Sequence, residues 1–220
     1  METIEKEIPR AYTHEDIERR TFDVLAFTDE WLRHLGDNVE RSGSILIYGG
    51  SGHGKTTYAL QLMKQLCNFG KVLYDSVEEG MKASFKRSLD INNIKSVSAK
   101  YVFQSEPLDE LTARLSRKRQ PKIVVIDSVQ YCFRGKNSKD YFDFVGKFPD
   151  TLFVWVSQMQ KGSPKGAVAD DIKYDAQLVI HVKDFKAYVE KSRTGADESV
   201  PYVISQEKAA EREVNLTRKL

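Results

Sequence analysis

Short apolar runs alternate with segments of helical spacing along most of the chain. The runs have the length of buried strands. They span 44–49, 71–75, 101–103, 121–128 and 151–158. Apolar residues recur at helical spacing in 58–66, 81–89 and 108–119, and more weakly through Phe142 and Phe144. The alternation predicts an α/β fold, in which helices cover both faces of a mostly parallel sheet.

The two ends of the chain differ from this pattern. Three shorter apolar runs predict strands that turn antiparallel at the sheet edge, at 178–182, 187–190 and 202–204. A charged, helix-compatible tail follows over 206–220. Near the start, 28–36 offers an N-cap, a helical run and a glycine stop. We therefore expect three parts: an arm with a short helix over 1–40, a core over 41–205, and the tail.

A glycine-rich turn joins the first core strand to the first core helix. Gly49, Gly54, Lys55 and Thr56 fit the spacing G-x-x-x-x-G-K-[ST] of a phosphate-binding loop. Backbone N–H groups can converge on a triphosphate only where no Cβ intervenes, and the helix N-terminus adds partial positive charge. The expected nucleotide-binding residues are Gly49, Gly50, Ser51, Gly52, His53, Gly54, Lys55, Thr56 and Thr57.

Each side chain of this loop has an expected role toward ATP and Mg²⁺. Lys55 is expected to bridge the β- and γ-phosphates, and the Thr56 hydroxyl to ligate Mg²⁺. His53 fills a variable position where only its backbone needs to face phosphate, so we expect no catalytic role for it.

Polar residues at the ends of three predicted strands are candidates for the same site. Ligands of parallel sheets lie beyond the carboxyl ends of the strands, where Glu78, Asp127 and Gln158 would meet the phosphate loop. Asp127 is expected to hold Mg²⁺ through its water shell, Glu78 to orient the attacking water, and Gln158 to contact the γ-phosphate or that water. The alternative for Glu78 and Glu79 is a pair of solvated loop carboxylates.

Composition narrows the class of protein. The chain has 220 residues, of which 40% are hydrophobic and 30% charged, and no apolar run is long enough to cross a bilayer. An acidic start without an apolar segment argues against a secretory signal, so we expect a cytoplasmic protein. Cys67 and Cys132 lack a C-x-x-C neighbour and are expected to be reduced core thiols, without zinc. A net charge of +2 does not by itself indicate a nucleic-acid binder.

Five motifs in order resemble the RecA/RadA/DnaB superfamily of P-loop ATPases. They are the residues 49–57, 74–79, 126–130, 156–158 and 191–195. The resemblance covers about 40–205 and implies a RecA-like ATPase core. It implies that Glu78 is the catalytic glutamate, Glu79 a second carboxylate, Asp127 the Walker B aspartate, and Gln158 the residue that couples γ-phosphate to a DNA-contacting loop.

The resemblance also implies self-association. Lys191 and Arg193 resemble a Lys-Asn-Arg motif whose cations reach the nucleotide of a neighbouring subunit, although Ser192 replaces the asparagine. Trans-acting cations would require a ring or a filament. An exposed basic strand end is the alternative. Phe22 to Phe27 either docks on a neighbouring subunit, as in filament-forming relatives, or packs on its own core.

Two loops are candidates for contact with single-stranded DNA. They are 131–139 and 159–166, which follow the strands that end in Asp127 and Gln158. The second is rich in Gly, Pro and Lys and is expected to be mobile. Tyr131 or Phe133 would be available to stack on bases. The cations that could neutralise phosphates are Arg134, Lys136, Lys139, Lys161 and Lys165. Solvated loop lysines are the alternative.

These expectations favour a Mg²⁺-dependent ATPase that acts on single-stranded DNA in recombination, annealing or repair. The absence of further domains resembles the minimal RecA-like proteins of phages and mobile elements. The motor core of a ring helicase and a KaiC-like ATP switch acting on a protein partner remain alternatives. A small-molecule P-loop kinase is disfavoured, because no arginine-rich lid is visible and the Glu-Glu pair suits water activation.

Overall fold

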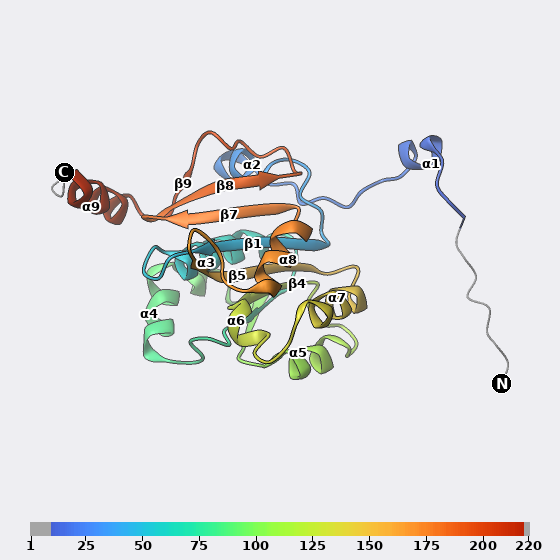
Figure 1. The fold of residues 1–220 in the computed structure, drawn as a ribbon, viewed down its shortest axis with the longest axis horizontal. Helices are drawn as coiled ribbons and strands as arrows, with labels where there is room; N and C mark the ends of the chain where they lie inside the picture. Colours follow the sequence, from blue (N-terminus) through green and yellow to red (C-terminus); the bar gives the residue numbers. More distant parts are fainter. Residues whose placement is uncertain (1–9, 218–220) are drawn as a thin grey trace.

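A twisted sheet runs through the body of the protein, with its strands in the order β3-β2-β4-β5-β1-β7-β8-β9 (Figure 1). The computed structural model describes residues 10–217. Over these residues it has nine strands. They are β1 (Gly43–Gly49), β2 (Val72–Asp75), β3 (Tyr101–Gln104), β4 (Ile123–Asp127), β5 (Leu152–Gln160), β6 (Ser163–Pro164), β7 (Leu178–Lys183), β8 (Lys186–Ser192) and β9 (Tyr202–Val203). The sheet is parallel from β3 to β7, whereas β8 and β9 are antiparallel. The predicted fold class is confirmed.

Helices pack on both faces of this sheet. The α-helices are α1 (His14–Glu18), α2 (Asp29–Leu35), α3 (Lys55–Leu66), α4 (Ala83–Ile91), α5 (Leu108–Leu115), α6 (Val129–Cys132), α7 (Ser138–Lys147), α8 (Ala167–Asp175) and α9 (Gln206–Thr217), and a 3₁₀ segment spans Ile94–Lys100. Alternate residues of a strand point to opposite faces. Ile45 and Ile47 of β1 therefore join the hydrophobic cluster of α2, α3 and α4, while Leu46 and Tyr48 join that of α5 to α8.

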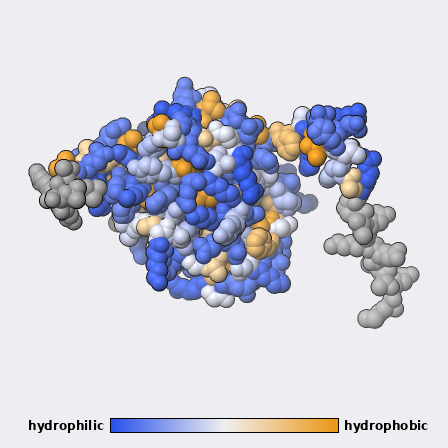
Figure 2. All heavy atoms as spheres, turned by 45° about the horizontal axis from the view of Figure 1, so that its top comes forward, coloured by the Kyte–Doolittle hydropathy of each residue, from blue (hydrophilic) through white to orange (hydrophobic). Residues whose placement is uncertain are grey.

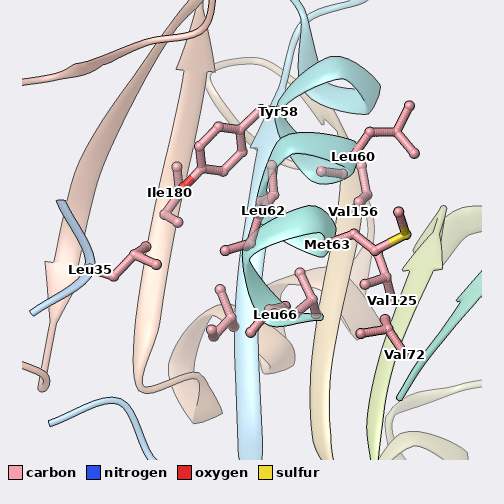
Figure 3. Packing of buried hydrophobic residues seen from close by; sticks show 14 of the residues in the cluster. Leu35, Tyr58, Leu60, Leu62, Met63, Leu66, Val72, Val125, Val156 and Ile180 are labelled. Carbon is pink, nitrogen blue, oxygen red and sulfur yellow. The ribbon is translucent and has the colours of Figure 1, made fainter. Parts of the chain in front are cut away.

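Helix α3 fixes the phosphate loop to the sheet. In Figure 3, Leu62, Met63 and Leu66 of α3 lie against strand residues that include Val156 and Val125, and all five side chains are fully buried. Truncation of such a side chain to alanine costs about 2 to 5 kcal/mol. The start of α3, which carries the loop, is thereby held in place by the core.

The segment that precedes the sheet is divided between the core and an arm. Leu25 and Phe27 are buried, and the Leu25 N–H donates to the Val39 carbonyl at 2.8 Å. The part of 22–27 that carries these residues thus packs on its own core, whereas Phe22 is 55% exposed. Figure 1 shows α1 well away from the body, and Figure 2 shows a mostly hydrophilic surface with a few hydrophobic residues on this arm.

Some helix boundaries differ from the sequence pattern. The helix expected over 108–119 ends at Leu115. Beyond it the Arg117 N–H donates to the Arg114 carbonyl in a tighter turn, and Arg119 adopts a left-handed φ of 64°. Helix α8, to which the sequence pattern assigned no element, packs Val168 and Ile172 against the sheet.

The segment 159–166, which the sequence predicts to be a mobile loop, forms a hairpin. Met159 pairs with Pro164 and Gln160 with Ser163. The two residues between them, Lys161 and Gly162, both have positive φ, at 51° and 84°. Two such residues form the tight turn that suits the right-handed twist of paired strands.

Within residues 10–217 no helix combines the length and the apolar character that a membrane span requires.

Candidate nucleotide-binding site

The phosphate loop occupies the turn between β1 and α3. Gly49 can only be glycine, because a Cβ there would lie 2.1 Å from the Val182 carbonyl oxygen, and Gly54 has a left-handed φ of 101°. The Lys55 ammonium donates to the Gly50 carbonyl at 2.8 Å, across the loop. A cavity of about 290 Å³ opens above these atoms. Its lining includes Ser51, Gly52, Gly54, Lys55, Thr56, Thr57, Glu78, Asp127 and Phe185.

Asp127 ends β4 directly beside the loop. Its Oδ2 accepts hydrogen bonds from the Thr56 hydroxyl at 3.1 Å and from the Tyr74 hydroxyl at 3.0 Å. Burial raises the pKa of Asp127 to about 6, and it also lowers the pKa of Lys55. The site thus holds a buried carboxylate and a half-buried ammonium, and the charged forms of both lack full solvation. This favours binding of a ligand that carries charges of both signs.

Thr56 and Asp127 also suit Mg²⁺. In nucleotide sites Mg²⁺ is typically held by one or two protein oxygens, phosphate oxygens and water. The bonded pair of Thr56 hydroxyl and Asp127 carboxylate supplies such oxygens at the edge of the phosphate cavity. Within residues 10–217 no group of three or more His, Cys, Asp or Glu side chains is arranged to hold a metal ion.

Glu78 reaches the site from the end of β2 and is fixed by two neighbouring strands. Its backbone N–H donates to the Asp127 carbonyl at 3.0 Å. Its carboxylate accepts from the Ser128 hydroxyl at 2.6 Å and from the Gln158 amide at 3.2 Å. Glu79 lines an adjoining cavity that Glu78 and Asp127 also border. Glu78, Asp127 and Gln158, the three residues that the sequence predicts to follow strands, therefore meet at the carboxyl edge of the sheet.

A chain of polar contacts leads from Glu78 to the hairpin 159–166. The Gln158 side-chain oxygen accepts from the Lys165 ammonium at 3.3 Å. Gln130 supports this link, because its amide donates to the Lys165 carbonyl at 2.7 Å and its oxygen accepts from the Gln158 N–H at 3.0 Å. Ser128 and Gln130 were given no role from the sequence. The feature of the sequence that could have indicated a role for them is their position just after Asp127, in the motif 126–130.

Sequence comparison places the chain near DNA-repair proteins. It is 32% identical over 116 residues to the DNA repair and recombination protein RadB of Pyrococcus horikoshii, which covers 49% of this chain and 50% of the relative. It is 34% identical over 102 residues to the DNA repair protein RadA of Streptococcus pneumoniae, covering 46% of this chain and 24% of the relative. The chain thus spans about half or less of the length of these relatives. No protein-family model matches it.

Structural comparison identifies the fold. The flagellar accessory protein FlaH of Methanocaldococcus jannaschii superposes with a TM-score of 0.59 at 17% identity, over 80% of this chain and 93% of that one. The chain has a RecA-like P-loop core. The resemblance drawn from the five motifs is confirmed at this level.

Lys191 and Arg193 lie along the strands of the RecA-like core, away from the phosphate loop. Lys191 pairs with Val179, which lies beside Leu46, three residues before Gly49. At about 3.3 Å per residue, the phosphate loop is about 10 Å further along the sheet. The Lys191 ammonium donates to the carbonyls of Lys173 and Tyr174 at 3.0 and 2.7 Å, whereas Arg193 is exposed. Neither cation lines the phosphate cavity of its own chain.

The candidate DNA loops of the RecA-like core lie side by side. A cavity of about 390 Å³ is lined by Arg134 and Lys136 of one loop, by Lys165 of the other, and by Gln130 of α6. Lys136 pairs with Asp109 at 3.0 Å.

The remaining residues of these loops differ in how accessible they are. Lys139 pairs with Asp143 at 2.5 Å, and Lys161 is exposed at the hairpin turn. Phe133 is buried against Tyr141 and Trp155, so the expectation that it stacks on bases is wrong. Tyr131 is half-buried, with the Arg134 guanidinium 5.0 Å from its ring centre.

Proposed function

We propose that the chain is a Mg²⁺-dependent ATPase that acts on single-stranded DNA in recombination or repair. The observation that carries the proposal is the continuous set of contacts from Thr56 and Asp127, through Glu78 and Gln158, to Lys165. Such a set joins a phosphate cavity to the hairpin that borders the candidate DNA cavity. The similarity to RadB and RadA supports DNA as the partner.

Each residue of the site has a separate role in the proposed hydrolysis of ATP. The loop amides and Lys55 bind and orient the triphosphate, and the Thr56 hydroxyl and Asp127 carboxylate would hold Mg²⁺, which supplies neutralisation of phosphate charge when bound. Glu78 orients the water that attacks the γ-phosphorus, with Glu79 beside it as a second carboxylate. Gln158, whose amide donates to Glu78 at 3.2 Å, would respond to the arrival of that water or of the γ-phosphate.

DNA would bind along the cavity between the two loops. Arg134, Lys161 and Lys165 are the cations of this surface that the structure leaves outside carboxylate pairs, within the residues it describes. They would neutralise backbone phosphates, and the half-buried Tyr131 would offer a stacking face at the rim. Lys136 and Lys139 would contribute only by exchanging their carboxylate partners for phosphate.

The decisive experiment measures phosphate release from ATP with and without single-stranded DNA. We expect DNA to stimulate release several-fold, and Lys55→Ala to abolish it, because the ammonium that contacts the phosphates is lost. Lys64→Ala, at the far end of the same helix α3, is the matched control and should leave release unchanged. Absence of release from the unmodified chain would overturn the ATPase proposal. Release that DNA does not alter would overturn the DNA proposal and favour a switch that acts on a protein partner.

A further inference from the structure

The turn between β7 and β8 packs directly on the phosphate loop. The Asp184 N–H donates to the His53 Nδ1 at 2.9 Å, and the Phe185 N–H donates to the His53 carbonyl at 3.1 Å. Both turn residues have positive φ, at 50° and 57°. His53, for which the sequence indicated no catalytic role, therefore anchors this turn. The Phe185 ring is brought into the lining of the phosphate cavity, next to Gly54.

The C-terminal helix α9 converges on the same place. Its lead-in residue Ile204 donates its N–H to the Phe185 carbonyl at 2.9 Å. The Lys208 ammonium lies 5.0 Å from the centre of the Phe185 ring, and the Arg212 guanidinium donates to the Gly52 carbonyl at 3.4 Å. Figure 1 shows α9 leaving the body at the end of the sheet where β7 terminates. Two cations of one helix thus contact the turn and the phosphate loop.

The lining of the phosphate cavity is asymmetric in its chemistry. Lys55, Thr56 and Asp127 supply charged and polar groups, whereas Phe185, whose ring centre lies 5.0 Å from the Lys208 ammonium of α9, supplies an aromatic surface. A nucleoside triphosphate has the same asymmetry, because a charged chain of phosphates is joined to an aromatic base. Bases stack on aromatic side chains, and this stacking does not require a particular base.

We propose that Phe185, with Lys208 and Arg212 of α9, forms the nucleoside-binding end of the site. The inference rests on the proposed function, since it assumes that the loop binds nucleoside phosphates. The base stacks on Phe185, and the two cations of α9 close over the ribose and the first phosphate. Ala209 is the one buried side chain among those described on α9, and Lys186 of β8 pairs with Glu213 of α9 at 2.5 Å.

The test compares a ligand that carries a nucleoside with one that consists of phosphates alone. Calorimetric titration with Mg²⁺-ADP and with inorganic tripolyphosphate is performed on the full chain and its variants. We expect Phe185→Ala to weaken ADP binding about tenfold, in line with the loss of one base stack, and to leave tripolyphosphate binding unchanged. Phe185→Leu keeps apolar packing against Gly54 and should lose ADP affinity to the same extent. The double variant Lys208→Ala, Arg212→Ala should weaken ADP binding several-fold.

Tyr188→Ala is the matched control. Tyr188 lies three residues further along the same hairpin, is 38% exposed, and faces a different cavity. It should leave both affinities unchanged. Unaltered ADP binding by both Phe185 variants, or equal loss of ADP and tripolyphosphate, would overturn the inference. If the unmodified chain binds neither ligand, the proposed function fails as well.

Discussion

Asp75 shows how a single buried carboxylate can influence the protein outside the candidate site. It ends β2, as Asp127 ends β4, and is fully buried. Its Oδ1 accepts from the Glu106 N–H at 2.8 Å, while its Oδ2 has no hydrogen-bond partner among the described residues. Burial raises the pKa of Asp75 to about 7. The folded protein therefore retains a proton here that the unfolded chain releases near the ordinary aspartate pKa of 3.8.

This carboxyl group should make stability depend on pH. Because the pKa is higher in the folded state, the contribution is fully present below about pH 4 and is lost as pH rises through 7. Between pH 5 and pH 8 the unmodified chain should lose about 3 kcal/mol of unfolding free energy that Asp75→Asn retains. Urea denaturation at the two pH values measures the difference. Asp150→Asn, at an exposed position, is the control, and an equal pH dependence of Asp75→Asn and the unmodified chain would contradict the assignment.

The contrast between Asp75 and Asp127 shows what sequence can predict at this scale. Both follow apolar strands, so the pattern alone does not separate them. Asp127 was placed correctly beside the phosphate loop because its motif accompanies a phosphate loop of fixed spacing. The burial of Asp75 depends on the packing of the segment around Glu106 and Arg114, which lies 31 or more residues away in the chain.

At the scale of elements, Lys191 links β8 to helix α8. Its ammonium donates to two carbonyls at the C-terminal end of α8, where backbone carbonyls lack partners within the helix. Lys191 is half-buried, and this burial lowers the pKa of its ammonium. Lys191 thus has a structural role whether or not it also acts on a neighbouring subunit.

Removing this cap should destabilise the fold. Lys191→Met keeps most of the aliphatic stem and removes the ammonium, so it should lower the unfolding free energy by about 1 kcal/mol. Arg193→Met is the matched change, because Arg193 is exposed and its contact to the Tyr174 carbonyl is 3.5 Å long. Arg193→Met should lower the unfolding free energy much less than Lys191→Met does. Denaturation of both variants by urea at neutral pH provides the measurement, and equal costs would exclude a capping role.

The sequence predicts the buried strands better than it predicts helix α8 or the hairpin, because burial of both strand faces leaves a stronger pattern. The buried strands are continuous apolar runs, because both of their faces are covered, and this signal is strong. Helix α8 is short and carries Asp170 and Asp171 beside its apolar residues, so its signal is weak. In 159–166, glycine and proline indicated mobility, whereas two successive positive φ values at Lys161 and Gly162 close an ordered hairpin.

At the scale of the whole molecule, the cations predicted to act in trans and the phosphate loop lie toward opposite ends of the strands. Arg193 follows β8 at the end where β7 begins, while the loop follows the end of β1. A head-to-tail arrangement of subunits, in a ring or a filament, would bring one subunit's Arg193 toward the next subunit's loop. The motifs of the sequence imply that Arg193 of one subunit lies near the phosphate loop of the next. The position of α1 away from the body follows from none of these motifs.

Mixing two inactive variants tests action in trans. Glu78→Gln removes the residue proposed to orient water, and Arg193→Ala removes the proposed trans cation, so each alone should hydrolyse ATP poorly. In an equal mixture, an interface that combines the intact Glu78 of one variant with the intact Arg193 of the other should form in roughly a quarter of cases. We therefore expect phosphate release to recover to roughly a quarter of the normal rate. A mixture no more active than its components would contradict trans action.

The hydrogen bonds that join Glu78, Gln158 and Lys165 have a further thermodynamic consequence. If occupancy of the phosphate cavity changes the partner of Gln158, and Gln158 holds Lys165, the two surfaces share one coupling free energy. Such coupling is reciprocal. Whatever binds the hairpin 159–166 must then alter the affinity for nucleotide by the same factor by which nucleotide alters the affinity of the hairpin for its ligand.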